Sequence, residues 1–394
     1  MTYAGDRLIH DADSHVMETP DWFVPFADPT IRDRLDPLFV GTVKPGEEHF
    51  IEVLRRKHTE DEEFRATAAD ELMQRKNWHA AGSFLKEDRG RALDLLGFAS
   101  QLVFNTFANG KLLEAERGGD LELAYGLARA HNRAMVDFCS ADPRLLPVGY
   151  VPLADVDRST AFAAEALELG CAALMVASAC PRSHSPSHIG LDPVWAQAEE
   201  AGIPVVFHVG GGGRLLDPQY FNNGMPEVPD FHGGAENFRS VDYMAIPYPP
   251  MQTLATLIID GVLDRFPRLM FGVIEQGASW LPGWMRQLDS AHDAFSKMEE
   301  RLQKLSARPS EIVRRQVRVT PYPAEDVGWI ISQAGEETCM FSSDYPHVEG
   351  GRNPIGRFER STEGLPDHVM QRFWSDNFVE LMGRALDRVP AASA

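Results

Sequence analysis

A regular alternation of short apolar segments with longer segments of helical period constrains the fold most. Eight segments have the composition of buried strands: residues 7–13, 101–104, 146–151, 172–176, 204–208, 269–274, 317–320 and 339–344. Segments of helical period lie between them, for example at 159–169, 192–201, 252–263 and 324–333. Pro193 and Pro282 mark predicted helix starts, and Gly170 and Gly202 mark predicted helix ends. This alternation predicts an α/β fold of the (β/α)8 TIM-barrel type.

The length of the chain fits one such barrel with additional segments. A single domain is predicted over residues 1–388 of the 394-residue chain, followed by a frayed tail at residues 389–394. Two segments are too long for ordinary loops: residues 40–85, after the first strand, and residues 209–249, after the fifth. In a barrel, both would lie over the carboxyl face, where βα loops build the active site.

The charge of the chain restricts its partners. The formal net charge is −20, which opposes binding to nucleic acid or to an anionic membrane surface, so small-molecule substrates are expected. The N-terminal residues lack a basic region followed by an apolar run, and no apolar stretch is long enough to span a bilayer. The four cysteines show no CxxC spacing. These features predict a cytoplasmic protein with reduced thiols.

The first predicted strand ends in Asp11-Ala-Asp13-Ser-His15. Because side chains alternate along a strand, Asp13 and His15 project to the same side and could bind one metal ion. The structural alternative is a strand-end turn capped by an aspartate.

Two further candidate ligands end other predicted strands. His208 closes the fifth strand and Asp344 closes the eighth, so both would reach the same rim as Asp13 and His15. The structural alternatives are a hydrogen-bonded core histidine and a turn aspartate. Together the four side chains supply two imidazole nitrogens and two carboxylates, a set compatible with Zn²⁺ or Mn²⁺.

Four motifs resemble those of the amidohydrolase-related family, which includes aminocarboxymuconate semialdehyde decarboxylase and the aromatic-acid decarboxylases. They are Asp11-Ala-Asp-Ser-His, Phe266-Pro-Arg-Leu, Glu275-Gln-Gly-Ala-Ser-Trp-Leu-Pro and Phe341-Ser-Ser-Asp-Tyr-Pro-His. The resemblance extends to Asp376-Asn377 and implies one divalent metal, Zn²⁺ in the first place and Mn²⁺ as the alternative. It also implies that the metal is held by Asp13, His15, His208 and Asp344, that Asp344 acts as a base, and that the chain forms a homodimer or a larger assembly.

The sixth strand departs from the family pattern, because Glu275 stands where the decarboxylases typically have a histidine. Glu275 could act as a general acid or base, position the substrate, add a metal ligand, or form an ion pair at the barrel mouth. His347 could orient Asp344 or contact substrate, or it could be an ordinary rim histidine. Arg182 and Arg214, in later loops, could bind a substrate carboxylate or could be solvated loop residues.

The whole-chain resemblance implies a non-oxidative decarboxylase, a carboxy-lyase, of a small carboxylated aromatic or unsaturated substrate. The departure at Glu275 leaves open a hydrolase of an amide, ester, lactone or C–C bond that uses the same metal centre, with Glu275 protonating the leaving group. A non-catalytic, metal-binding or scaffold barrel is the third possibility.

Overall fold

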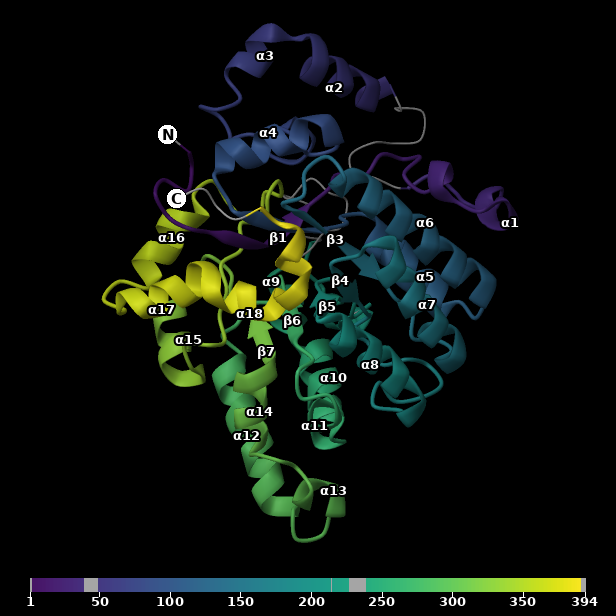
Figure 1. Ribbon diagram of the computed structural model, residues 1–394, viewed down its shortest axis with the longest axis vertical. Coiled ribbons are helices and arrows are strands. Elements are labelled where there is room, and N and C mark those ends of the chain that lie inside the picture. Colours follow the sequence, from purple (N-terminus) through teal and green to yellow (C-terminus); the bar gives the residue numbers. More distant parts are fainter. Residues whose placement is uncertain (1, 39–48, 214, 227–238, 391–394) are drawn as a thin grey trace.

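A parallel sheet of seven strands forms the centre of the molecule, as the computed structural model shows (Figure 1). The structure describes residues 2–38, 49–213, 215–226 and 239–390. The strands are β1 His10–His15, β2 Ser100–Phe104, β3 Leu145–Tyr150, β4 Ala173–Met175, β5 Val205–His208, β6 Phe271–Ile274 and β7 Val317–Val319. Each strand pairs in parallel with the next one in sequence. The first seven predicted strands are thereby confirmed.

The eighth predicted strand, residues 339–344, forms no continuous ladder, but its segment contacts both edges of the sheet. On the β7 side, the N–H of Met340 donates to the carbonyl of Val319 at 2.9 Å; on the β1 side, the N–H of Asp344 donates to the carbonyl of Asp13 at 2.9 Å. Asp344 has φ of 51°, so the backbone leaves the extended conformation there. The architecture is an α/β fold with a curled seven-stranded sheet, consistent with a TIM-like barrel.

Helices surround this sheet (Figure 1). Those of eight or more residues are α2 His49–Glu60, α4 Lys86–Leu96, α5 Ala108–Arg117, α6 Leu121–Cys139, α7 Val156–Leu169, α8 Asp192–Ala201, α10 Tyr248–Ile259, α12 Leu281–Phe295, α14 Pro309–Gln316, α15 Val327–Ala334 and α16 Pro354–Ser361. The shorter ones are α1 Pro29–Arg32, α3 Glu62–Ala66, α9 Ser240–Ala245, α11 Val262–Arg265, α13 Glu300–Gln303, α17 Asp367–Gln371 and α18 Asn377–Met382.

The predicted helix boundaries at proline and glycine are confirmed. Pro193 and Pro282 lie in the first turns of α8 and α12, where a missing N–H leaves no bond unmade. Gly170 and Gly202 end α7 and α8 with φ of 101° and 67°, a conformation that glycine adopts without steric cost.

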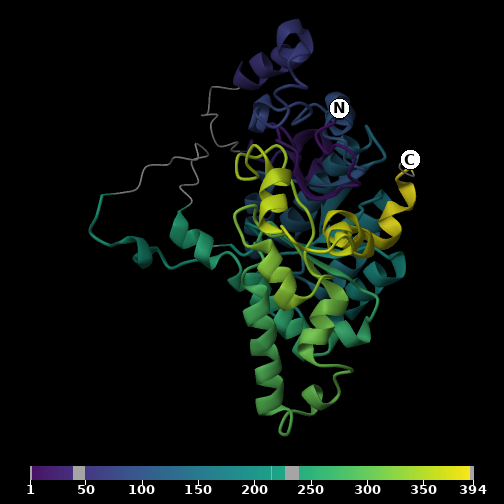
Figure 2. The same ribbon diagram turned by 90° about the vertical axis from the view of Figure 1, so that its left-hand side faces the viewer.

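Two regions of the chain lie outside the sheet and its surrounding helices. Between β1 and β2, helices α2 and α3 lie at one end of the molecule, beyond α4 (Figure 1). Between β5 and α10, part of the chain extends away from the body (Figure 2). Both regions fall within the segments predicted as excursions, and their status as insertions in a barrel stays a prediction. Residues 39–48, 214 and 227–238 of these segments, and residues 391–394 of the predicted tail, lie outside the described residues.

Strand β5 is apolar up to its last residue, and this places its histidine at the carboxyl end. Val205, Val206 and Phe207 of β5 are buried, as expected of a parallel sheet covered on both faces. His208 is the last residue of that strand.

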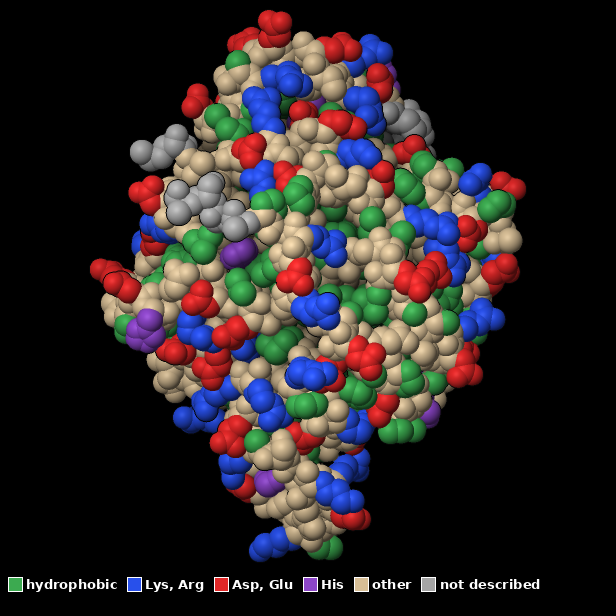
Figure 3. Space-filling view, viewed as in Figure 1, with side chains coloured by type: hydrophobic (Ala, Val, Ile, Leu, Met, Phe, Trp, Pro, Cys, Tyr) green, Lys and Arg blue, Asp and Glu red, His purple; other side chains and the backbone are tan. Residues whose placement is uncertain are grey.

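Acidic and basic side chains are interspersed over the face that Figure 3 shows. Within the described part of the chain, no helix combines the length and apolar character needed to cross a bilayer.

Candidate active site

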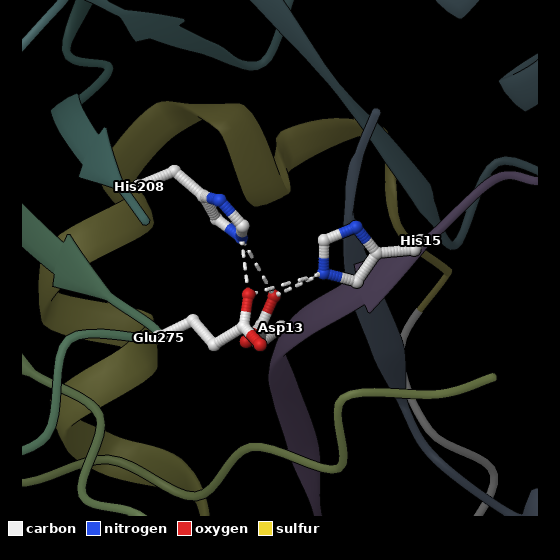
Figure 4. A group of neighbouring side chains, drawn as sticks. All are labelled: Asp13, His15, His208 and Glu275. Carbon is white, nitrogen blue, oxygen red and sulfur yellow. Dashed lines mark hydrogen bonds and ion pairs between the residues drawn. The ribbon is translucent and has the colours of Figure 1, made fainter. Parts of the chain in front are cut away.

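Four of the predicted side chains converge at the carboxyl ends of three strands (Figure 4). Asp13 and His15 come from β1, His208 from the end of β5, and Glu275 directly follows β6. One ligand atom of each residue lies within 4.8 Å of the others. The two imidazole rings point toward the two carboxylates (Figure 4). The prediction that alternation places Asp13 and His15 on one side of β1 is thus consistent with the geometry.

The contacts in this group are longer than strong hydrogen bonds. Oδ1 of Asp13 is 3.2 Å from Nε2 of His15 and 3.4 Å from Nε2 of His208. Oε2 of Glu275 is 3.3 Å from Nε2 of His208 and 3.8 Å from Nε2 of His15. All four groups therefore face a common point, and the hydrogen bond between Nε2 of His208 and Oδ1 of Asp13 is a long one.

Asp344 and His347 adjoin this group. Ligand atoms of His15, Glu275, Asp344 and His347 also lie within 4.8 Å of one another. Oδ1 of Asp344 is 3.5 Å from Nε2 of His15 and 2.9 Å from Nδ1 of His347, and the rings of His15 and His347 stack at 3.9 Å. The structure thus brings all six predicted site residues together.

Arg182, which was predicted as a possible substrate-binding cation, does not lie among these six residues. Its guanidinium donates to the carbonyl of Arg117 and lines a separate cavity of about 260 Å³. Arg214 lies outside the described residues.

Backbone carbonyls determine which ring nitrogen of His15 and of His208 carries the proton. Nδ1 of His15 is 2.9 Å from the carbonyl of Asn105, and Nδ1 of His208 is 3.1 Å from the carbonyl of Val209. A carbonyl only accepts, so each Nδ1 carries the proton, and in the neutral ring Nε2 presents a lone pair to the centre. Burial, followed by the charge of His347, lowers the pKa of His15 to about 4, so this ring is neutral near pH 7.

His347 is held in the opposite protonation state. The hydroxyl of Thr106 donates to the carbonyl of Val16 at 2.8 Å, so it accepts from Nε2 of His347 at 2.9 Å. Nδ1 faces Asp344, which requires a proton there as well. Burial is the largest single influence and lowers the pKa of His347, but the charge of Asp344, its hydrogen bond and the charges of Glu349 and Asp13 together outweigh burial and raise the pKa to about 9. His347 is therefore an imidazolium paired with Asp344.

The loop after β2 orients these histidines, and sequence reasoning missed it. Glu18 is fully buried and accepts from the N–H groups of Thr106, Phe107 and Ala108 at 3.0 to 3.1 Å, which fixes the loop at the start of α5. The same loop supplies the Asn105 carbonyl. The one signal available in the sequence was position, since Asn105 and Thr106 directly follow a buried strand.

Two of the site carboxylates stand on strained backbone. Glu275 and Asp344 have φ of 53° and 51°, a left-handed conformation that few residues other than glycine adopt. Such positions cost of order 1–3 kcal/mol and persist where surrounding bonds enforce them. Here the N–H of Glu275 donates to Oγ1 of Thr320 at 2.8 Å, and its carbonyl accepts from the hydroxyl of Tyr322 at 2.8 Å. With this backbone conformation, both carboxylates lie in the cluster of candidate ligands.

The buried polar atoms of the site that lack hydrogen-bond partners are suited to binding a cation. Oδ2 of Asp13, Nε2 of His15 and Oδ2 of Asp344 are buried and have no hydrogen-bond partner among the described residues, whereas Oδ1 of Asp344 is ion-paired with His347. Buried polar atoms are rarely left in this state, and lone pairs directed at carboxylates repel each other. A divalent ion among them would satisfy all of these atoms, and nitrogen and oxygen donors suit Zn²⁺ or Mn²⁺.

The sequence model of the amidohydrolase family, described as "Amidohydrolase", matches residues 19–380. The chain belongs to this family. The match includes His208, Glu275 and Asp344, and it begins just after Asp13 and His15. It confirms the family that the motifs of this amidohydrolase had indicated. No curated protein matches the sequence.

Solved structures share the fold of this amidohydrolase. An amidohydrolase from Mycobacterium avium subsp. paratuberculosis has a TM-score of 0.73 at 22% identity, covering 96% of this chain and 100% of its own. The 5-carboxyvanillate decarboxylase of Novosphingobium aromaticivorans, complexed with manganese and 4-hydroxy-3-methoxy-5-nitrobenzoic acid, has a TM-score of 0.62 at 19% identity, with 97% of each chain covered. A dihydroxybenzoic acid decarboxylase of Polaromonas, with manganese and 2-nitroresorcinol, has a TM-score of 0.61 at 15% identity, covering 96% of this chain and 97% of its own.

Proposed function

We propose that this amidohydrolase is a metal-dependent decarboxylase, a carboxy-lyase, that releases CO₂ from a small carboxylated aromatic or unsaturated substrate. The observation that carries the proposal is the convergence of two imidazoles and three carboxylates at the carboxyl ends of the strands. Decarboxylases of 5-carboxyvanillate and of dihydroxybenzoic acid that hold manganese share this fold. We infer a closed (β/α)8 barrel as the scaffold of the site.

In this proposal Asp13, His15, His208 and Asp344 hold one divalent ion, Zn²⁺ or Mn²⁺. The bound ion supplies positive charge beside the substrate carboxylate and stabilises the charge that develops as CO₂ leaves. Glu275 also lies within reach of the same point. Asp344→Asn and Glu275→Gln variants separate the two carboxylates: the first is expected to lose the metal and the second to retain it.

We assign proton delivery to Glu275 and the positioning of Asp344 to His347. Decarboxylation leaves the electron pair of the broken C–C bond on carbon, and that carbon must take up one proton. We assign its delivery to Glu275, whose side chain is 13% exposed, against 1% for Asp13 and 9% for Asp344, and which is thus the most accessible of the three carboxylates. His347, as an imidazolium, holds Asp344 in place through Nδ1.

The test is CO₂ release from a panel of carboxylated aromatic acids by protein loaded with Mn²⁺ or Zn²⁺. Wild type is compared with His208→Ala and with His368→Ala, a control whose side chain is 69% exposed. We expect CO₂ from wild type and from the control, and loss of both metal and CO₂ in His208→Ala. Undiminished CO₂ release by His208→Ala would contradict the proposal.

A hydrolase is the second candidate, and Glu275 favours it. A carboxylate beside the centre, in place of the histidine that the family resemblance implies for decarboxylases, can take a proton from the attacking water and pass it to the leaving group of an amide, ester or lactone. Hydrolysis products without CO₂, lost in Glu275→Gln, would establish this alternative. The homodimer or larger assembly and the cytoplasmic location stay predictions.

A further inference from the structure

A buried carboxylate near the candidate ligands has no role in the proposed function. Asp11 lies in β1, two residues before Asp13, and its side chain is fully buried. Moving a carboxylate out of water is costly unless hydrogen bonds compensate for the lost solvation. The hydrogen bonds that Asp11 makes therefore indicate what its burial maintains.

Both oxygens of Asp11 accept two hydrogen bonds. Oδ1 accepts from the N–H of Ser343 at 2.8 Å and from the N–H of Asp13 at 3.3 Å. Oδ2 accepts from the hydroxyl of Ser343 at 2.6 Å and from the side-chain amide of Gln101 at 2.8 Å. Two of these four bonds therefore bind one residue, Ser343, which directly precedes the candidate ligand Asp344.

These bonds connect β1 to a segment that pairs with it sparsely. The segment that carries Asp344 meets β1 at an isolated bridge rather than along a ladder. The N–H of Asp344 donates to the carbonyl of Asp13 at 2.9 Å. The neighbouring N–H, that of Ser343, donates to the side chain of Asp11 instead. The Asp11 carboxylate thus supplies an acceptor that a continuous strand pair would supply from its backbone.

The hydroxyl of Ser343 extends this restraint to the residue after Asp344. It donates its proton to Oδ2 of Asp11, and its oxygen accepts from the N–H of Tyr345 at 3.1 Å. A chain of hydrogen bonds that starts at Asp11 therefore holds the residues on both sides of Asp344. The left-handed φ of 51° at Asp344 lies between these two residues, and such a conformation persists where surrounding bonds enforce it.

Close packing of Gly350 restricts the same two residues. A Cβ atom at Gly350 would lie 2.9 Å from Cβ of Asp344 and closer still to the carbonyl oxygen of Ser343. The backbone of Gly350 thus approaches both residues directly and leaves them little room to shift in its direction. The hydrogen bonds of Asp11 and this packing together limit where the Asp344 carboxylate can lie.

We propose that Asp11 is a positioning residue that fixes the Asp344 carboxylate for metal binding. This inference rests on the proposed function, in which Asp344 is a metal ligand. Asp11 acts on the ion through Ser343 and Asp344 rather than by contact. Loss of a partner that orients a metal ligand typically costs about 10- to 100-fold in metal affinity, so loss of Asp11 should weaken metal binding by about that factor.

The test measures Mn²⁺ affinity by calorimetry in Asp11→Ala, Asp11→Asn and Asp289→Ala. Asp289, in α12, accepts the same pair of bonds from Ser310, at 3.0 Å from the N–H and 2.8 Å from the hydroxyl, and lies outside the ligand cluster, so it is the matched control. We expect Asp11→Ala to bind Mn²⁺ about 10- to 100-fold more weakly than wild type. Asp11→Asn, which keeps Oδ1 as an acceptor, should fall between them. Asp289→Ala should lower the thermal midpoint but bind Mn²⁺ as wild type does.

Hydrogen exchange of the metal-free protein measures the positioning itself. Asp11→Ala should speed exchange in the peptide that covers residues 341–347 while the peptide that covers β5 keeps its protection. Unchanged exchange at residues 341–347, an equal loss of protection in β5, or unchanged Mn²⁺ affinity would overturn the inference. If wild type bound no Mn²⁺ but exchange changed as expected, the role of Asp11 in positioning would stand and the proposed metal site would fail. If Asp11→Ala does not fold, Ser343→Ala, which loses only the hydroxyl, replaces it and is judged by the same outcomes.

Discussion

Replacing Asp13 by Asn should stabilise the metal-free protein and remove the stabilisation that metal binding gives to wild type. In the metal-free protein, the Asp13 carboxylate faces the Nε2 lone pairs of His15 and His208, and a Glu275 oxygen lies within 4.8 Å. Two carboxylates at that distance repel by about 3.5 kcal/mol at an effective dielectric constant of about 20. The amide of Asn removes this repulsion and offers an N–H to the two imidazoles.

The size of the effect follows from this repulsion. Part of it is relieved by relaxation, so Asp13→Asn should stabilise the metal-free protein by about 1–3 kcal/mol. An unfolding entropy of about 2.1 cal/mol/K per residue, applied to 394 residues, converts 1 kcal/mol into roughly 1.2 °C. The thermal midpoint should therefore rise by roughly 1–4 °C. With Mn²⁺ at about 100 times its Kd, wild type should gain about 2.7 kcal/mol, a gain that the variant should lack.

The assay is scanning calorimetry of chelator-treated protein, with and without added Mn²⁺. Asp70→Asn, at an exposed aspartate, is the matched control and should behave as wild type in both states. If Asp13→Asn destabilised the metal-free protein by more than about 1 kcal/mol, or gained as much from Mn²⁺ as wild type, Asp13 would be a structural anchor rather than a ligand.

Two other changes have defined consequences. Thr106→Val removes the acceptor for Nε2 of His347. It should therefore lower the pKa of His347 and reduce kcat/KM about 10-fold, with metal content unchanged. NMR titration of His347 and steady-state kinetics check these two effects, and Thr106→Ser should restore both values. His131 is fully buried, and burial lowers its pKa from 6.5 to about 3. Below pH 6.5, His131 therefore becomes protonated in the unfolded state but stays neutral in the folded state, which lowers the free energy of unfolding. Between pH 6 and pH 5, wild type should therefore lose about 1 kcal/mol more stability than His131→Leu in urea unfolding, and equal losses would show that His131 is protonated in the folded protein.

The sequence was sufficient to predict the strands and the convergence of the site because both follow from local pattern. Seven apolar segments became strands in the predicted order, and residues at their carboxyl ends necessarily meet at one edge of a parallel sheet. The segment at residues 339–344 was harder to predict, because the left-handed backbone at Asp344 interrupts an otherwise strand-like pattern. An aspartate at that position, unlike a glycine, does not by itself predict the left-handed conformation.

The contacts that determine protonation could not be predicted from the chain. Thr106 reaches the site from the loop after β2, through a pairing with His347, which is 241 positions away in the sequence. Periodicity carries no information on such long-range contacts.

Anomalous diffraction at the manganese edge from crystals grown with Mn²⁺ tests the central claim most directly. The account predicts one strong peak per chain, bounded by Asp13, His15, His208 and Asp344. Absence of a peak there, or a peak that these four side chains do not contact, would contradict the assignment of this cluster as the metal centre.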